Sequence, residues 1–96
     1  KPDFFHAHLN LGAVLKDLGQ LKEAEVSIRK SIELSPNLFN SHFLLATILI
    51  GQNKYQEAEI ACRKSIALNP NLFNSHFLLG NIPIQGVTIA FSQEQK

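Results

Sequence analysis

Apolar residues recur along most of the chain at the spacing of amphipathic helices, with short polar turns between the segments. The first segment follows Asp3, whose carboxylate can accept hydrogen bonds from the first backbone N–H groups of a helix, and it stops at Gly19. Its wide buried face is expected to contain Ala7, Leu11, Val14, Leu15 and Leu18. The same reasoning predicts helices over Leu21–Leu34, Phe39–Ile50 and Tyr55–Leu68.

The second of these segments is amphipathic in the same sense. Its apolar face is expected to contain Leu21, Ala24, Ile28, Ser31 and Ile32. Ala24 and its counterpart Ala58 are small enough to let two helices approach closely. Residue Asn37 is predicted to cap the third segment, and residues 51–54 to form the turn after it. The acidic residues of the two EAE motifs are interpreted as solvated charges near helix starts: Glu23, Glu25, Glu57 and Glu59.

These signals repeat with a fixed period. Pro2, Pro36 and Pro70 stand 34 residues apart, and the ten letters PNLFNSHFLL occur identically over 36–45 and 70–79. A period in this range indicates one supersecondary unit that is copied and stacked. Stacked units present surfaces more readily than pockets, so binding is the first hypothesis for function.

The third copy begins like the others and then departs from the pattern. Pro83 falls where its first helix should continue, and 86–96 carry no second-helix pattern. Within that stretch, 87–91 are typical of a strand or an irregular arm. The predicted organisation is unit 1 over 2–35, unit 2 over 36–69, the first helix of a degenerate unit 3 over 70–82, and an irregular tail over 83–96.

Composition narrows the class of protein. Of 96 residues, 45% are hydrophobic and 18% charged, which is typical of a folded chain, and the net charge of +1 gives no basic footprint for nucleic acid. Cys62 is the only cysteine and no apolar run reaches membrane-spanning length, so we expect a cytoplasmic protein without membrane or nucleic-acid partners. The chain starts at Lys1 and lacks methionine, which suggests a fragment or a processed form.

The order of these features resembles the tetratricopeptide repeat family, whose pattern is W-x2-L-G-x2-Y, then A-x3-F, then P. The first unit gives His8-x2-Leu11-Gly12-x2-Leu15, then Ala24-x3-Ile28, then Pro36. The second gives His42-x2-Leu45-Ala46-x2-Leu49, then Ala58-x3-Cys62, then Pro70. The third gives only His76-x2-Leu79-Gly80. The local sequence of the units is similar to that of bacterial arrays of many near-identical repeats, which are often joined to another domain.

The resemblance implies that the first helices of the units line the concave face of a right-handed superhelix and bind extended peptides or partner helices. Helical spacing assigns residues to that face. They are His6, Leu9, Asn10, Ala13 and Lys16 in the first unit, Asn40, Phe43, Leu44 and Thr47 in the second, and Asn74, Phe77, Leu78 and Asn81 in the third. The alternative is that Phe43, Phe77 and their neighbours only pack between units.

Two variants of groove recognition known in similar proteins do not fit. A clamp for a terminal carboxylate needs polar groups where Leu9 and Ala13 stand. An asparagine ladder needs an asparagine in every unit, but Asn10 is matched by Leu44 and Leu78.

Metal binding, catalysis and phosphate binding find little support in the sequence. His8, His42 and His76 form a periodic column, but equivalent atoms of stacked units lie about 10 Å apart, while zinc ligands must converge within about 2.1 Å of one ion. The column is therefore interpreted as packing, and Cys62 as a buried, inert core thiol. The segment GNIPIQG lacks the lysine of a phosphate loop. We expect no metal, no cofactor and no catalysis.

The sequence thus predicts an all-α, helix-turn-helix repeat solenoid that acts as a protein–protein interaction scaffold. Two alternatives stay open: the recognition arm of a larger transferase, or a truncated or frame-shifted array without independent function. The last predicted helix is too apolar to be a solvating cap. The chain is therefore expected to be marginally stable or to associate with itself through its C-terminal end.

Overall fold

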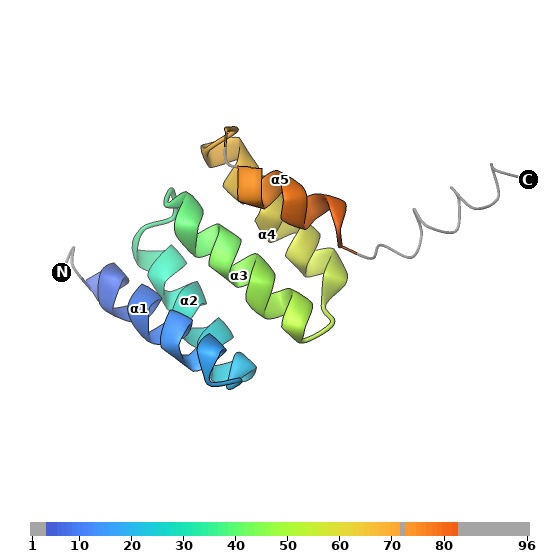
Figure 1. Ribbon diagram of the computed structural model, residues 1–96. Coiled ribbons are helices and arrows are strands. Elements are labelled where there is room, and N and C mark those ends of the chain that lie inside the picture. The colour runs from blue at the N-terminus through green and yellow to red at the C-terminus, as the bar shows by residue number, and fades with distance from the viewer. Residues whose placement is uncertain (1–3, 72, 83–96) are drawn as a thin grey trace, which may run out of the picture.

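The computed structural model describes residues 4–71 and 73–82, and the regular secondary structure of this part of the chain is all α-helix (Figure 1). Its helices are α1 (Phe4–Asp17), α2 (Leu21–Leu34), α3 (Phe39–Gly51), α4 (Tyr55–Leu68) and α5 (Phe73–Gly80). The predictions for the Asp3 cap, the interruption at Pro83, the strand or arm over 87–91 and the tail over 83–96 lie outside the described residues.

The helices form two hairpins and a fifth helix. α1 packs on α2 and α3 packs on α4, while α2 contacts α3 and α4 contacts α5. In Figure 1, α1, α3 and α5 lie in one layer and α2 and α4 in a second layer behind it. The prediction of an all-α helical repeat of two units plus a further first helix is confirmed.

The turns within the two hairpins each contain one residue with a positive φ angle. Gly19 has a φ of +81° and Asn53, 34 positions later, has a φ of +63°. Glycine and asparagine are the residues that enter this left-handed region most readily. The repeat therefore keeps the same turn even though the residue at its centre has changed.

The N-terminus of α3 differs from the prediction. Leu38, in an extended conformation, precedes the first residue of α3, and no side chain caps this end, so the prediction that Asn37 acts as the cap is wrong. The loop is instead fixed by two side chains inside the helix. The Ser41 hydroxyl donates to the Leu38 carbonyl at 2.9 Å, and His42 Nε2 bonds the Pro36 carbonyl at 2.7 Å.

The core lies between the two helix layers and contains small residues at the closest approaches. Two buried serines tie each second helix to its own first helix: Ser31 donates to the Phe5 carbonyl at 2.9 Å, and Ser65 to the Phe39 carbonyl at 3.1 Å. These bonds join the same two positions of the repeat. The buried apolar residues are Ala24, Ile28, Leu45, Ala46, Ile48, Leu49, Ala58, Ala61, Cys62 and Ile82.

One predicted buried face is exposed. Leu11, Val14 and Leu18 of α1 keep 50%, 53% and 66% of their surface in solvent, and Gly12 is the buried residue of this helix. Their counterparts Leu45 and Ile48 are 5% and 0% exposed, because α2 packs on that side of α3. No helix of the described chain covers α1 in the same way. None of its helices combines the length and hydropathy of a membrane span.

Candidate partner-binding groove

The residues assigned to a groove lie on the first helices of their units, except Asn81, which follows the last residue of α5. His6, Leu9, Asn10 and Ala13 are on α1, Asn40, Phe43, Leu44 and Thr47 on α3, and Asn74, Phe77 and Leu78 on α5. These three helices share one layer (Figure 1), and α1 contacts α3 directly. No hydrogen bond within residues 4–71 and 73–82 links these side chains across helices, so their polar groups do not satisfy one another across the layer.

At the α1 end the surface is mixed. His6 is exposed, and its ring lies 4.1 Å from the ring of Phe5, centroid to centroid. Leu9 is half-buried and packs against the core, and Asn10 is exposed. This end therefore offers an imidazole and an amide beside a shallow apolar floor.

On α3 the candidates are more deeply set. Phe43, Leu44 and Thr47 are half-buried, while Asn40 is exposed. The Thr47 hydroxyl donates to the carbonyl of Leu44, one turn earlier in the same helix, at 2.7 Å. That donor is already used, so Asn40 carries the readily available polar group of this segment.

On α5 the aromatic candidate is open to solvent. Phe77 keeps 63% of its surface exposed and stacks on Phe73, with 6.0 Å between ring centroids. Asn74 is exposed beside it, and Leu78 packs against the core. Packing between units thus accounts for part of the Phe43 surface but for little of the Phe77 surface.

The structure also contains a pocket that the groove prediction does not include. It has a volume of about 390 Å³ and lies between α2, α3 and α4. Its α3 wall is formed by His42, Leu45 and Leu49, which occupy the Trp, Leu and Tyr positions of the repeat pattern. The shorter side chains at the first and third positions were the signal in the sequence. The remaining lining residues are Arg29, Ile32, Glu57, Ile60, Ala61 and Lys64.

The histidine column has a hydrogen-bonding role. His76 Nε2 bonds the Pro70 carbonyl at 2.7 Å, which repeats the bond of His42 to Pro36. His42 is buried but His76 is exposed, so interior packing describes only the former. Within the described ranges, no group of three or more His, Cys, Asp or Glu side chains could hold a metal ion.

Cys62 is buried in the core, and its Sγ atom lies 3.1 Å from the carbonyl oxygen of Ser75, as a weak donor. Burial raises the pKa of this thiol above its ordinary value. Because the thiolate is the reactive form, the interpretation of Cys62 as a buried core thiol agrees with the structure.

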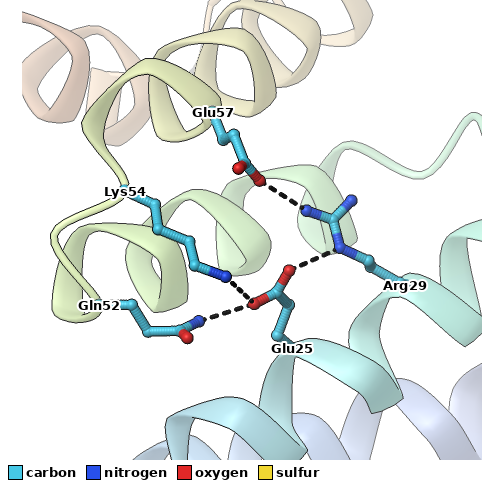
Figure 2. Close-up of polar contacts among 5 residues, drawn as sticks. All are labelled: Glu25, Arg29, Gln52, Lys54 and Glu57. Atoms are coloured by element: carbon cyan, nitrogen blue, oxygen red, sulfur yellow. Dashed lines mark hydrogen bonds and ion pairs between the residues drawn. The ribbon is translucent and has the colours of Figure 1, made fainter.

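One glutamate of the EAE motifs is not a solvated charge. Figure 2 shows Glu25 accepting hydrogen bonds from Arg29 Nε at 2.8 Å, Gln52 Nε2 at 2.8 Å and Lys54 Nζ at 3.2 Å. Arg29 also donates to Glu57 at 3.1 Å. The group therefore links α2 to the turn and second helix of the next unit, and the prediction of solvated charge is wrong for Glu25.

The electrostatics of Glu25 follow from these bonds. Its side chain is only 13% exposed, and burial by itself would raise the pKa of the carboxyl. Hydrogen bonds from Gln52, Arg29 and Lys54 outweigh that effect and lower the pKa from 4.5 to about 2. The carboxylate is thus held ionised, as expected for a group that receives three donors, two of them cationic.

Comparison with known families places the chain in a class. Two sequence models of the tetratricopeptide repeat match it, one over 5–38 and the other over 39–72, and together they span most of its length. The chain belongs to the tetratricopeptide repeat family. Repeats of this family generally mediate protein–protein interactions and typically act as non-catalytic scaffolds. Comparison with curated proteins gave no match.

Proposed function

We propose that this chain is a protein-interaction module that binds an extended peptide or a partner helix across α1, α3 and α5. The observation that carries the proposal is the exposure of equivalent positions on that layer. Asn40 and Asn74 are 34 residues apart, both exposed, and each precedes a phenylalanine by three residues. The same pairing of an asparagine with a phenylalanine therefore occurs twice on this layer, with Phe77 exposed and Phe43 half-buried.

The chemistry of this surface suggests what it would bind. Each asparagine amide has donors and an acceptor that suit the backbone of an extended peptide. Phe77 supplies a rigid aromatic surface of the kind that anchors interfaces. The occupant should therefore place apolar side chains along the α3–α5 end, because the proposed groove residues of these two helices include no Asp, Glu, Lys or Arg.

The test is affinity capture with the full-length protein from its source cell. Phe43→Ala combined with Phe77→Ala should remove most of the captured partner, because it deletes both aromatic contacts. Asn40→Lys combined with Asn74→Lys changes only exposed side chains and should weaken the same partner by at least tenfold. Circular dichroism melts of each variant confirm that the helices are retained.

A matched pair of exposed residues on the other helix layer controls for non-specific hydrophobic binding. Val26 and Ile60 are equally exposed aliphatic residues on α2 and α4, also 34 positions apart. Val26→Ala combined with Ile60→Ala should leave capture unchanged. A partner set that is indifferent to the Phe43 and Phe77 pair, or that depends on the Val26 and Ile60 pair, would place binding elsewhere.

We further propose that the chain associates with itself through the α5 end, where the stacked pair Phe73 and Phe77 is largely exposed. Sedimentation velocity should show larger species as the concentration rises. Phe73→Ser combined with Phe77→Ser should keep the chain monomeric over the same range. A wild-type chain that stays monomeric and melts in one sharp transition would contradict this proposal.

Two further parts of the hypothesis rest on the sequence. A reducing, cytoplasmic location is supported by the single free Cys62. The alternative role, as the recognition arm of a larger transferase, uses the same interaction surface and is decided by the rest of the open reading frame.

A further inference from the structure

The pocket between α2, α3 and α4 opens on the layer formed by α2 and α4. Its buried residues form the floor, and they are His42, Leu45, Leu49 and Ala61. Its exposed residues form the rim and belong to the two second helices: Arg29, Glu57, Ile60 and Lys64. None of the residues proposed for the groove lines this pocket, so the two sites are separate.

The pocket has the size and the lining of a small-molecule site. Its volume of about 390 Å³ falls within the range of roughly 300–1,000 Å³ in which ligand pockets lie. Apolar side chains from all three helices line it, among them Ile32, Leu45 and Ile60. Ligand pockets combine such apolar walls with a few polar groups that fix the orientation of the ligand.

Two residues of α3 explain why the pocket is present. His42 and Leu49 stand where the repeat pattern has tryptophan and tyrosine, and both positions line the pocket. The side chains of tryptophan and tyrosine are larger than those of histidine and leucine. The His42 ring is also held at the Pro36 carbonyl, 2.7 Å from its Nε2 atom. The pocket therefore has room for an aromatic ring that the chain itself does not supply.

The rim contains three charged side chains, and two of them neutralise each other. Arg29 donates to Glu57 at 3.1 Å, and its Nε atom also donates to Glu25. Lys64, the third, forms no ion pair within residues 4–71 and 73–82. The uncompensated charge at the rim is therefore positive.

The equivalent lysine of the first unit has an acidic partner that Lys64 lacks. Lys30 lies 34 positions earlier and pairs with Glu33, three residues further along α2, at 3.6 Å. The residue three positions after Lys64 is Ala67, so the second unit does not keep this pair. Such a lysine at the rim of an apolar pocket is electrostatically complementary to an anionic ligand.

We propose that this pocket binds a small organic anion, with a planar aromatic ring system and one carboxylate on a short chain. The ring system occupies the space beside His42 and Leu49, and the carboxylate pairs with Lys64 at the rim. The ligand is a free small molecule. An aromatic side chain of a partner protein would present neutral backbone amides at the rim and would leave Lys64 unmatched.

The test is a titration of the full-length, ¹⁵N-labelled chain with indole-3-propionate, followed by two-dimensional NMR. Saturable shift changes should be largest at the backbone amides of Ile32, Leu45, Leu49 and Ala61, which line the pocket. Tryptamine has the same ring and chain length but ends in an ammonium group, and it should bind at least about fivefold more weakly. The neutral N-acetyltryptophanamide, which imitates a tryptophan within a polypeptide, should bind about threefold more weakly.

A substitution that fills the pocket tests the location. His42→Trp places the residue of the repeat pattern on the pocket floor and should abolish saturable binding of indole-3-propionate. His76→Trp is the matched control, because it makes the same exchange on α5 and also removes a histidine bond to a proline carbonyl. It should leave the affinity unchanged. Phe77→Ala should have no effect either, which distinguishes this pocket from the proposed groove.

Charge reversal at the rim tests the carboxylate contact. Lys64→Glu should weaken the binding of indole-3-propionate at least about fivefold, and the variant should prefer tryptamine. Lys30→Glu makes the same change of charge at the equivalent position of α2, which does not line the pocket, and it should leave the affinity unchanged.

Four results would overturn the proposal. The first is the absence of saturable binding by indole-3-propionate, and the second is binding of N-acetyltryptophanamide that is equally tight. The third is an equal loss of affinity from Lys64→Glu and Lys30→Glu, and the fourth is undiminished binding by the His42→Trp variant. If His42→Trp lowers the helix content, Leu49→Tyr, which fills the pocket from the other end of its α3 wall, replaces it in the comparison.

Discussion

Ile28→Ala is expected to lower the free energy of unfolding by about 2–4 kcal/mol. Ile28 is 0% exposed, and its side chain occupies the space that the missing Cβ of Gly12 leaves on α1. Truncation leaves a cavity where the two helices of the first unit approach most closely. Since small domains are stable by only about 5–15 kcal/mol, a chain of this size should lose much of its stability margin. Urea unfolding followed by circular dichroism measures the change.

Ile60→Ala supplies the matched control, because it makes the same chemical change on α4 at a side chain that is 70% exposed. It should change the stability by less than about 0.5 kcal/mol. Alanine favours helix over isoleucine, so helix preference cannot cause a loss at either position. Equal losses at the two positions would show that burial does not govern the result.

A second variant tests the contact between Gly12 and Ile28 directly. A Cβ added at Gly12 would lie 2.6 Å from Ile28 Cγ1, so Gly12→Ala alone should be destabilising by about 1–3 kcal/mol. In the Ile28→Ala background the same change should be neutral or favourable, because the clash is gone and alanine favours helix over glycine. The second unit already shows this exchange, with Ala46 and Cys62 at the corresponding positions. Additive effects would contradict the proposed contact.

The sequence was sufficient to predict where the helices lie, because the residues that favour and end a helix are close together in the chain. Period, turn residues and two near-identical copies predicted α2 and α4 with the ends that the structure has, and α3 with a difference of one residue. Gly19 was identifiable as a helix stop because glycine adopts positive φ without strain. Asn53 was harder to identify, since asparagine has many other roles in turns.

What the sequence did not reveal depends on contacts between units. The apolar stripe of α1 has the same pattern as that of α3, yet Leu11 is exposed while Leu45 is buried, because only one of them has a helix against it. The pocket beside His42 arises from three helices together. Likewise, the motif around Glu25 recurs around Glu59, and only the next unit decides which glutamate gains further partners.

Glu25→Gln is expected to lower the free energy of unfolding at pH 7 by about 1.5–3 kcal/mol, the usual range for hydrogen bonds to a charged group. Glutamine keeps the size of the side chain, but it removes the charge that Arg29 and Lys54 bind across the contact between units. Glu59→Gln is the control: Glu59 is 26% exposed and pairs with Arg63 of its own helix. Its loss should be below about 0.5 kcal/mol.

The pH dependence of the unfolding free energy tests whether the charge of Glu25 is the cause of this stabilisation. Folding lowers the pKa of Glu25 from 4.5 to about 2, so the folded chain binds this proton less readily than the unfolded chain does. The stabilisation is fully present above about pH 4.5 and is lost as the pH falls toward 2. The wild-type and Glu25→Gln proteins should therefore differ most near neutral pH and converge as the pH approaches 2, whereas the Glu59→Gln difference stays small throughout. If the Glu25→Gln deficit were the same at pH 7 and near pH 2, the contribution would come from the shape of the side chain and not from its ionisation.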